Sequence, residues 1–313
     1  MTITTTAILP PAVREYYDRL LLMTAYPTLV HTKFAQKRIL PEKMGDTIVF
    51  RRYARLATVP IPLVDGVTPP GAPLSVTDIK ATVDFYGNFV TITNQVELTV
   101  EDRVLNESAR LLAQNLAQTM DEVTRDVLAS TSSVLQASNG VNGQTPTELT
   151  KADIDNAVRT LLGNDAEMIS EVVVGRDAFG TSPVRPAFWA YIDTDLLDDL
   201  EAVANFIHSA NYPNQQTVLD AEWGATGNVR WLYTSVGSVS SAATPVYNNF
   251  IIGKEAYAVV HLRSETGEFY VEPLGSAGAA DPLHQRGSVG WQHPFVARIL
   301  NDAFMINLMA THS

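Results

Sequence analysis

The chain has 313 residues, 46% of them apolar and 18% charged, a composition typical of globular proteins whose length favours two lobes over one core. Its formal net charge of −12 argues against a protein that holds nucleic acid through a general basic face. The absence of cysteine excludes disulfides and thiolate chemistry, and no apolar run approaches the ~18 residues of a membrane helix.

The N-terminal segment combines a threonine-rich start, two adjacent prolines and a short helical candidate at residues 12–22. It lacks the basic region that begins a secretory signal, so we expect no signal peptide. Little of it could fold alone. We therefore expect an N-terminal arm over residues 1–44 that orders against other parts of the structure.

The next fifty residues contain two extended runs on either side of a segment rich in proline and glycine. The runs are DTIVFRRY at 46–53 and KATVDFYGNFVTITN at 80–94, in which the apolar phase shifts at Gly87 and Asn88 as a bulge or bend would cause. This pattern predicts a long projecting hairpin within residues 45–96. A two-stranded hairpin is marginal in water, so we expect it to rest on another surface.

Residues 97–130 contain no glycine or proline, and their apolar side chains recur at steps of three and four. This period predicts one long amphipathic helix of roughly 45 Å, capped by Thr99 and Asp102. So long a helix needs an equally long surface to lie against. The predicted buried stripe consists of Val104, Leu105, Leu111, Leu112, Leu116, Met120, Val123, Val127 and Leu128.

The remaining segments predict a mixture of helices and strands without βαβ alternation, which indicates an α+β fold. A helix is expected at 150–162, capped by Thr150 and Asp153, and an acidic helix at 193–206. A short helix or turn is expected at 254–260. Strands are expected at 171–175, 188–192, 229–235, 247–253 and 268–273, and as two extended runs within 290–310.

The sequence shows no recognised catalytic constellation. Gly287–Gly290 comes nearest to a nucleophile elbow, but Arg286 occupies the place of the first glycine. The six histidines are scattered without a metal-ligand spacing. We therefore expect no enzyme activity, no metal and no cofactor.

Charge is unevenly distributed along the chain, with bases at 33–55 and acids at 193–201. Both groups fit solvated faces. They also fit a basic arm that pairs with an acidic patch on a neighbouring copy. The candidate contact residues, with one exposed position of the long helix added, are Lys33, Lys37, Arg38, Arg51, Arg52, Arg55, Arg110, Asp195, Asp198 and Asp199.

The order of these parts resembles the major capsid protein of tailed bacteriophages. Four segments, GDTIVFRRY, KATVDFYGNFVTITNQVELT, RPAFWAYIDTDLLDDL and DPLHQRGSVGWQHPFVARILND, are similar to the coat-protein subfamily of certain short-tailed phages. The resemblance implies five parts: an N-arm at 1–44, a strand and E-loop hairpin at 45–96, a spine helix at 97–144, an axial domain at 145–273, and return strands of a peripheral domain at 274–313.

The resemblance implies that copies assemble as pentamers and hexamers into an icosahedral virion shell around double-stranded DNA, without sequence-specific binding, in the host cytoplasm. Only about 40 residues precede the first predicted strand, so we expect a separate scaffolding protein beside a portal and decoration proteins. Two alternatives stay open. One is an encapsulin-like nanocompartment shell, and the other, less favoured, is a soluble α+β enzyme with a cleft near His208 and Trp223.

Overall fold

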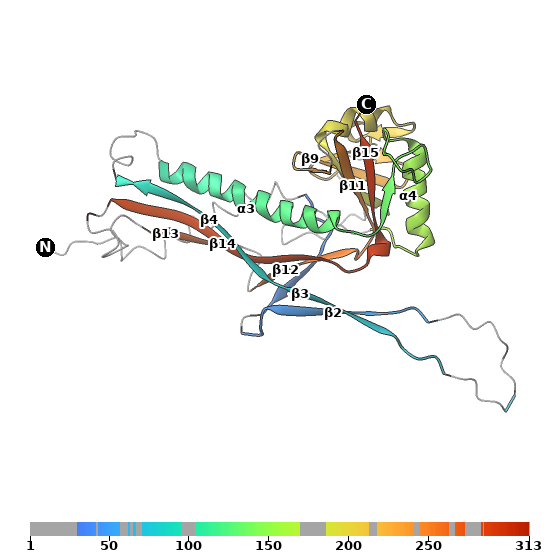
Figure 1. Cartoon of the computed structure of the whole chain (residues 1–313), viewed down its shortest axis with the longest axis horizontal. Helices are drawn as coiled ribbons and strands as arrows, with labels where there is room; N and C mark the ends of the chain where they lie inside the picture. The colour runs from blue at the N-terminus through green and yellow to red at the C-terminus, as the bar shows by residue number, and fades with distance from the viewer. Residues whose placement is uncertain are drawn as a thin grey trace.

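The structure is a computed structural model in which the described residues form two lobes and a projecting hairpin (Figure 1). The predicted elements at 12–22 and 171–175, and the predicted start of the long helix with its cap, lie outside the described residues. The described residues are 30–41, 43–56, 62, 65–66, 71–94, 104–169, 186–212, 218–240, 244–262, 267–272, 283 and 285–312.

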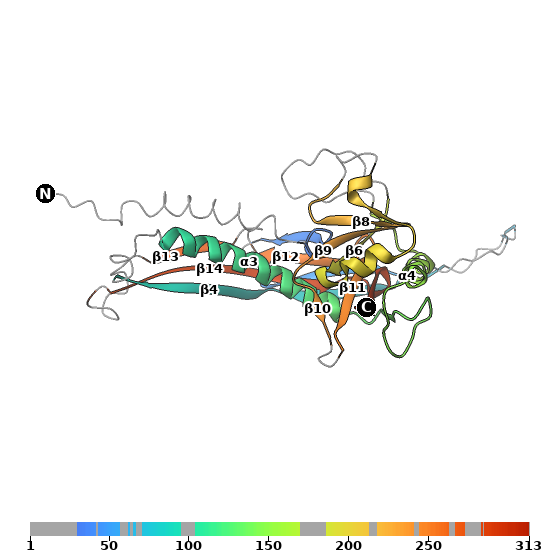
Figure 2. The same ribbon diagram turned by 90° about the horizontal axis from the view of Figure 1, so that it is seen from above.

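The first lobe is a five-stranded sheet with the long helix α3 (Val104–Ala129) lying along it (Figures 1 and 2). β1 pairs with β12 in parallel, and the other strands pair antiparallel. The strands run in the order β1 (Gln36–Leu40), β12 (Tyr257–Leu262), β14 (Arg286–Ile299) and β13 (Glu268–Glu272), with β4 (Asp84–Thr93) also pairing with β14.

Helix α3 confirms the prediction of a long helix over the 26 residues that the structure describes. Its buried face includes Leu112 and Leu116, but Leu111 is 55% exposed, so its place in the predicted stripe was wrong. Ala109, Ala113 and Ala117 are buried instead, because a helix that lies close to a sheet needs small side chains at the contact. On the sheet side, Asn115 Oδ1 accepts from Asn88 Nδ2 of β4 and from Trp291 Nε1 of β14.

The second lobe is an eight-stranded sheet flanked by helices α4 (Lys151–Gly163) and α5 (Leu197–Ala202) (Figure 2). Every residue of the central strand β6 (Phe188–Asp193) is buried. β10 (Ser238–Val239) pairs with β11 off the main path. That path runs β5 (Val134–Gln136), β15 (Met305–Thr311), β11 (Val246–Ile252), β6, β9 (Val229–Thr234), β8 (Glu222–Thr226) and β7 (Phe206–His208).

The two predicted helices of this lobe differ in how closely they match the structure. The predicted capping box of α4 is present, because the Thr150 side chain accepts from the Asp153 amide and the Asp153 side chain accepts from the Thr150 amide. The predicted acidic helix at 193–206 was too long. It consists of the 3₁₀ turn η3 (Thr194–Leu196) and α5, and it ends where Val203 is extended and Asn205 has a φ of +66°.

The two sheets divide the chain differently from the expected boundary between residues 273 and 274. The segment expected as a short helix or turn becomes strand β12, which pairs with β14 in the first lobe, as does β13. Conversely, β15 lies between β5 and β11 in the second lobe. These pairings join segments far apart in sequence, which local periodicity does not report.

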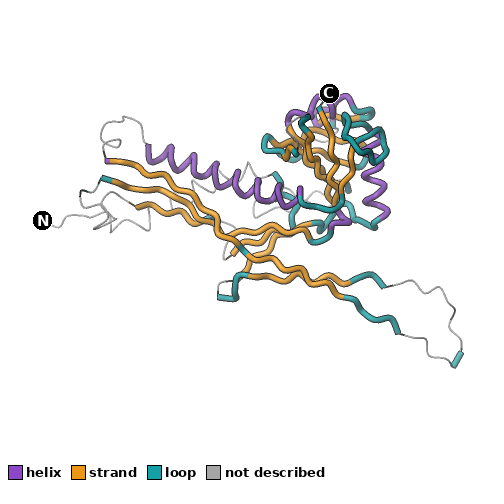
Figure 3. Tube along the Cα trace, in the orientation of Figure 1, coloured by secondary structure: helices purple, strands orange, loops and turns teal. Residues whose placement is uncertain are grey.

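The predicted projecting hairpin is present, with β2 (Thr47–Tyr53) paired antiparallel with β3 (Val76–Thr82), and it projects away from both lobes (Figure 3). Its second strand was expected at 80–94, but most of that run forms β4, which pairs with β14 in the first lobe. Val83 separates β3 from β4. The expected bend at Gly87 and Asn88 is absent, because β4 pairs with β14 without interruption. A Cβ at Gly87 would lie 2.9 Å from the Trp291 carbonyl oxygen, so this glycine allows close strand approach instead.

A buried histidine pair in the first lobe predicts that the subunit is sensitive to acid. His261 Nδ1 lies 2.9 Å from His293 Nε2, and burial, His293 and Lys37 together lower the pKa of His261 to about 3. Its unfolded-state pKa of about 6.5 is higher, so the unfolded chain binds the proton first and stability falls as pH drops from 6.5 to 3. At pH 5 the loss is about 2 kcal/mol.

We expect His261→Gln to reduce this loss, measured by urea unfolding at pH 7.5 and pH 5. His312→Gln is the matched control, because a hydrogen bond from the His312 ring to the Asp199 carboxylate raises the pKa of His312 and so gives the opposite pH dependence. If His261→Gln has the same pH dependence as the wild type, the pair does not cause the acid sensitivity.

Candidate assembly surfaces

The part of the chain that the structure describes holds no group of three or more His, Asp or Glu side chains placed to bind a metal, and none of its helices has the length and apolarity to cross a membrane. At the cleft expected for an enzyme, the His208 ring packs edge-on against Trp223, and its Nδ1 accepts the Ala210 amide as the cap of η4 (Ser209–Asn211). His208 thus has a structural role.

The β2–β3 hairpin exposes apolar side chains on both strands and beyond them. Cross-strand pairs hold its register, including Thr47 Oγ1 to Thr82 Oγ1 at 3.0 Å and Arg51 Nε to Asp78 Oδ1 at 3.0 Å. Its apolar packing on the body is at its base, where Ile48 and Phe50 contact the small core around Val260. Its exposed apolar residues are Val49, Tyr53, Leu56, Leu74 and Val76.

A second exposed apolar surface, here called the aromatic strip, consists of Phe85, Phe89 and Tyr270. Phe89, Gly290 and Tyr270 lie opposite one another across β4, β14 and β13. Side chains alternate along strands, so the strip lies on the sheet face opposite the one that α3 covers. Phe89 is 70% exposed and Phe85 62%.

Gly290 permits this arrangement of the aromatic strip. A Cβ at position 290 would lie 2.8 Å from the Phe89 Cβ, closer than side-chain carbons approach each other. A larger residue would push the Phe89 ring out of line with Tyr270. The spacing of Phe85 and Phe89 by four residues places both side chains on one face of the strand and is the sequence signal for this surface.

The predicted basic contact residues of the hairpin have partners within the chain. Arg51 pairs with Asp78 across the hairpin, Arg52 Nη1 donates to the Leu300 carbonyl at 3.4 Å, and Arg55 Nη1 lies 2.5 Å from Asp165 Oδ2. The two ion pairs are largely exposed. Exposed pairs of this kind contribute only about 0.2–1 kcal/mol, so they can exchange partners at low cost.

The other bases lie nearer the body. Lys33 Nζ donates to the Asp220 carbonyl at 2.8 Å, and burial lowers the pKa of Lys33. Lys37 is half-buried and Arg38 exposed on β1, and Arg110 is exposed on α3.

The predicted acidic patch lies on η3 and α5 of the second lobe. Asp195 Oδ2 accepts from the Tyr247 hydroxyl at 2.9 Å, and Asp199 Oδ2 lies 2.8 Å from His312 Nδ1. Asp198 is exposed. The patch lies at the end of the second lobe that is far from the hairpin (Figure 1), and these two interactions hold the side chains of Asp195 and Asp199 in place.

Comparison with known proteins identifies the architecture. A family model for phage capsid proteins matches residues 76–301, well over half of the chain. No curated protein sequence matches the chain at a significant level.

Solved structures of phage heads share the fold. The capsid of Ralstonia phage GP4 matches with a TM-score of 0.65 at 12% identity, over 93% of this chain and 91% of that chain. The head of Helicobacter pylori bacteriophage KHP40 matches with a TM-score of 0.65 at 14% identity, over 92% and 90%. A Synechococcus elongatus encapsulin matches less well, with a TM-score of 0.56 at 7% identity, over 89% and 86%.

These matches confirm the expected resemblance and the α+β capsid fold with a long helix beside a sheet and a projecting hairpin. The chain belongs to the phage capsid protein family, and it is a structural protein that self-assembles into the capsid shell of a virion.

Proposed function

We propose that copies of this chain assemble as pentamers and hexamers into an icosahedral head that encloses packaged double-stranded DNA. The observation that carries this proposal is the β2–β3 hairpin, a projection that exposes apolar side chains and whose apolar contacts with the body lie at its base. A surface of this kind needs a partner. The net charge of −12 favours a container that holds DNA without tight phosphate contacts.

The proposal includes further partners and a place of assembly. A separate scaffolding protein, a portal and decoration proteins act with this chain, assembly takes place in the host cytoplasm, and the chain has no enzyme activity of its own. An axial and a peripheral domain also stay part of the proposal. The second lobe, which includes β15, is the axial domain, and the first lobe, which includes β12 and β13, is the peripheral domain.

Within the shell, we place the hairpin of one copy against the aromatic strip of the next. The hairpin and the strip are different surfaces of one chain, so their contact is heterologous, and heterologous contacts close into rings when the rotation allows. Both surfaces expose apolar side chains. Their contact would cover side chains that the isolated chain leaves in water.

Phe89→Asp is expected to abolish shell formation and to leave the subunit folded, because the side chain is exposed in the subunit and covered only by a neighbour. The measurement is the yield of shells by sedimentation, with circular dichroism as the test of folding. Thr91→Asp is the matched control, since Thr91 is exposed two residues further along the same strand. Equal yields for Phe89→Asp and wild type would place the contact elsewhere.

The ten candidate contact residues form the electrostatic part of the proposal. The bases of the hairpin and the acids of η3 and α5 lie in different parts of the subunit, so the two groups meet only if a second copy supplies one of them (Figure 3). Complementary charge of this kind contributes more to the choice and register of partners than to affinity.

The double variant Arg51→Glu and Arg52→Glu is expected to impair assembly without unfolding the subunit, because it reverses the charge that meets the neighbour. Shell yield at low and moderate salt measures the effect. Asp78→Asn is the control, since it removes the partner of Arg51 within the chain and keeps the basic surface. An unchanged yield for the double variant contradicts the charge pairing.

An encapsulin-like nanocompartment is the second candidate, and the Synechococcus elongatus encapsulin match favours it. The match is weaker than those to the two phage heads, and the family model is that of phage capsids. Nuclease treatment of shells purified from their natural source distinguishes the two. Protected double-stranded DNA supports the phage head, and an enclosed enzyme supports the nanocompartment.

A further inference from the structure

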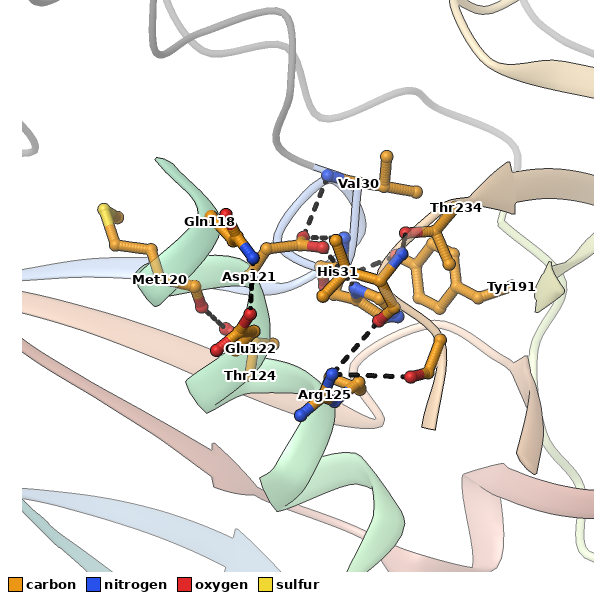
Figure 4. Close-up of polar contacts among 12 residues, drawn as sticks. Val30, His31, Gln118, Met120, Asp121, Glu122, Thr124, Arg125, Tyr191 and Thr234 are labelled. Carbon is orange, nitrogen blue, oxygen red and sulfur yellow. Dashed lines mark hydrogen bonds and ion pairs between the residues drawn. The ribbon is translucent and has the colours of Figure 1, made fainter. Parts of the chain in front are cut away.

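Residues 30–35, here called the strap, cross the junction between the two lobes and contact both of them. Val30, Phe34 and Ala35 are buried in the core cluster that α3 shares with strands of both sheets. The strap makes its main polar contacts with Asp121, in the middle of α3 (Figure 4). It is therefore placed to hold the lobes in one relative orientation.

Both oxygens of the Asp121 carboxylate contact the strap. Its Oδ1 accepts the backbone amides of Val30 at 3.1 Å and His31 at 2.8 Å, and its Oδ2 lies 2.7 Å from His31 Nδ1. Asp121 and His31 are buried almost completely. Hydrogen bonds to an ionised carboxylate are stronger than neutral ones, and a buried carboxylate that loses its donors carries the full cost of desolvation. The strap and α3 are thus joined by a bond that is costly to break.

The same turn of the strap also reaches both sheets. The His31 carbonyl accepts from the hydroxyl of Tyr257, on β12 of the first lobe, and at 3.4 Å from the hydroxyl of Tyr191, on β6 of the second lobe. Burial raises the pKa of both phenols, so both stay protonated and donate. One backbone carbonyl therefore joins the two sheets.

Two further contacts connect the strap to the second lobe. The Phe34 ring stacks on Trp189 of β6 with centroids 4.6 Å apart, and Lys33 Nζ donates to the Asp220 carbonyl just before β8. The apolar core between the lobes is not directional, whereas these hydrogen bonds are. The hydrogen bonds of the strap therefore restrict the relative orientation of the two lobes more than apolar packing alone does.

We propose that Asp121, acting through the strap, fixes the angle between the two lobes and thereby the curvature at which copies join in the shell. The first half of this proposal concerns the subunit alone. The second half rests on the proposed function, since a shell closes only if each subunit presents its surfaces at a constant angle. Asp121 is a positioning residue, because it acts on the lobes through the strap.

The test compares the full-length chain with Asp121→Asn, which keeps the shape of the side chain and removes its charge. Because the chain has no cysteine, cysteines placed at exposed Gln114 on α3 and Thr160 on α4 can carry spin labels without background. Dipolar electron spin resonance then reports the distance between the lobes. Labelled subunits are measured unassembled, or diluted with unlabelled copies in shells. Glu122→Gln, which removes the same charge from the next residue of α3, is the control.

The expected result for Asp121→Asn is unchanged helix content, exchange of the Val30 and His31 amides faster by about tenfold or more, a broadened distance distribution, and shells of mixed diameter. If Asp121→Asn does not fold, His31→Asn is the milder test, because it removes the side-chain contact with Asp121 and keeps the two backbone amides bound. Its readouts are the distance distribution and the shell diameter.

Faster amide exchange with an unchanged distance distribution would overturn the proposal and make the strap a local attachment. A broadened distribution with shells of uniform diameter would overturn the link to curvature alone. If the wild-type chain forms no shells, the proposed function fails, while the distance measurement on the subunit still decides the role of the strap.

Discussion

Leu112→Asn is expected to unfold the subunit. Leu112 is 2% exposed, between α3 and the five-stranded sheet. Loss of a buried leucine costs about 2–5 kcal/mol in packing, and an amide left without partners adds about 1–3 kcal/mol. Together these approach the ~5–15 kcal/mol that stabilises a typical domain. Urea unfolding followed by circular dichroism, or the absence of soluble protein, measures the effect.

Leu111→Asn is the matched control, because Leu111 is the adjacent residue on the same helix and is 55% exposed. This substitution is expected to change the free energy of unfolding by less than about 0.5 kcal/mol. Any effect of Leu111→Asn on shell yield would then report a contact of the outer helix face with another copy. Equal destabilisation by both substitutions would mean that α3 is buried on both sides within the subunit.

Glu222→Gln is expected to destabilise the second lobe by about 3–5 kcal/mol, because it leaves the Arg230 guanidinium buried without its counter-charge. Arg230 binds Glu222 through two hydrogen bonds, Nε to Oε1 at 2.7 Å and Nη2 to Oε2 at 2.6 Å, and both residues are buried. The guanidinium also lies 4.4 Å from the centroid of Trp189. Thermal unfolding of the variant and of wild type measures the loss.

The double variant Glu222→Leu and Arg230→Met distinguishes the effect of an unpaired buried charge on stability from the effect of lost packing. Replacing both ions by apolar side chains of similar volume removes the unpaired charge, so we expect it to recover most of the stability that Glu222→Gln loses. Glu201→Gln is a second control, because Glu201 accepts from Trp223 Nε1 in an exposed contact and its charge is not buried. If Glu222→Gln and Glu201→Gln have equal effects, the buried pair contributes little.

The elements that the sequence predicted well are those whose cause is local. The absence of glycine and proline and the helical period indicate α3, and Thr150 with Asp153 indicates the start of α4. The exposure of Leu111 was missed because the alanines of α3, which count little in an apolar stripe, make the closest contact with the sheet.

Long-range pairings account for what the sequence left undetermined. The places of β12 in the first lobe and of β15 in the second depend on pairing with partners 30 or more residues apart, which no short window along the chain contains. Among the candidate contacts, the Arg51 to Asp78 pair follows from the hairpin register once that register is known. The contacts of Asp121 with the strap and of Arg55 with Asp165 follow only from the tertiary structure.

Electron microscopy of the purified full-length chain, alone and with a scaffolding protein from the same phage, tests the central claim most directly. The account predicts closed shells, or free pentamers and hexamers, in at least one of the two preparations. Particles of monomer size only, in both preparations and from protein shown to be folded, would contradict it.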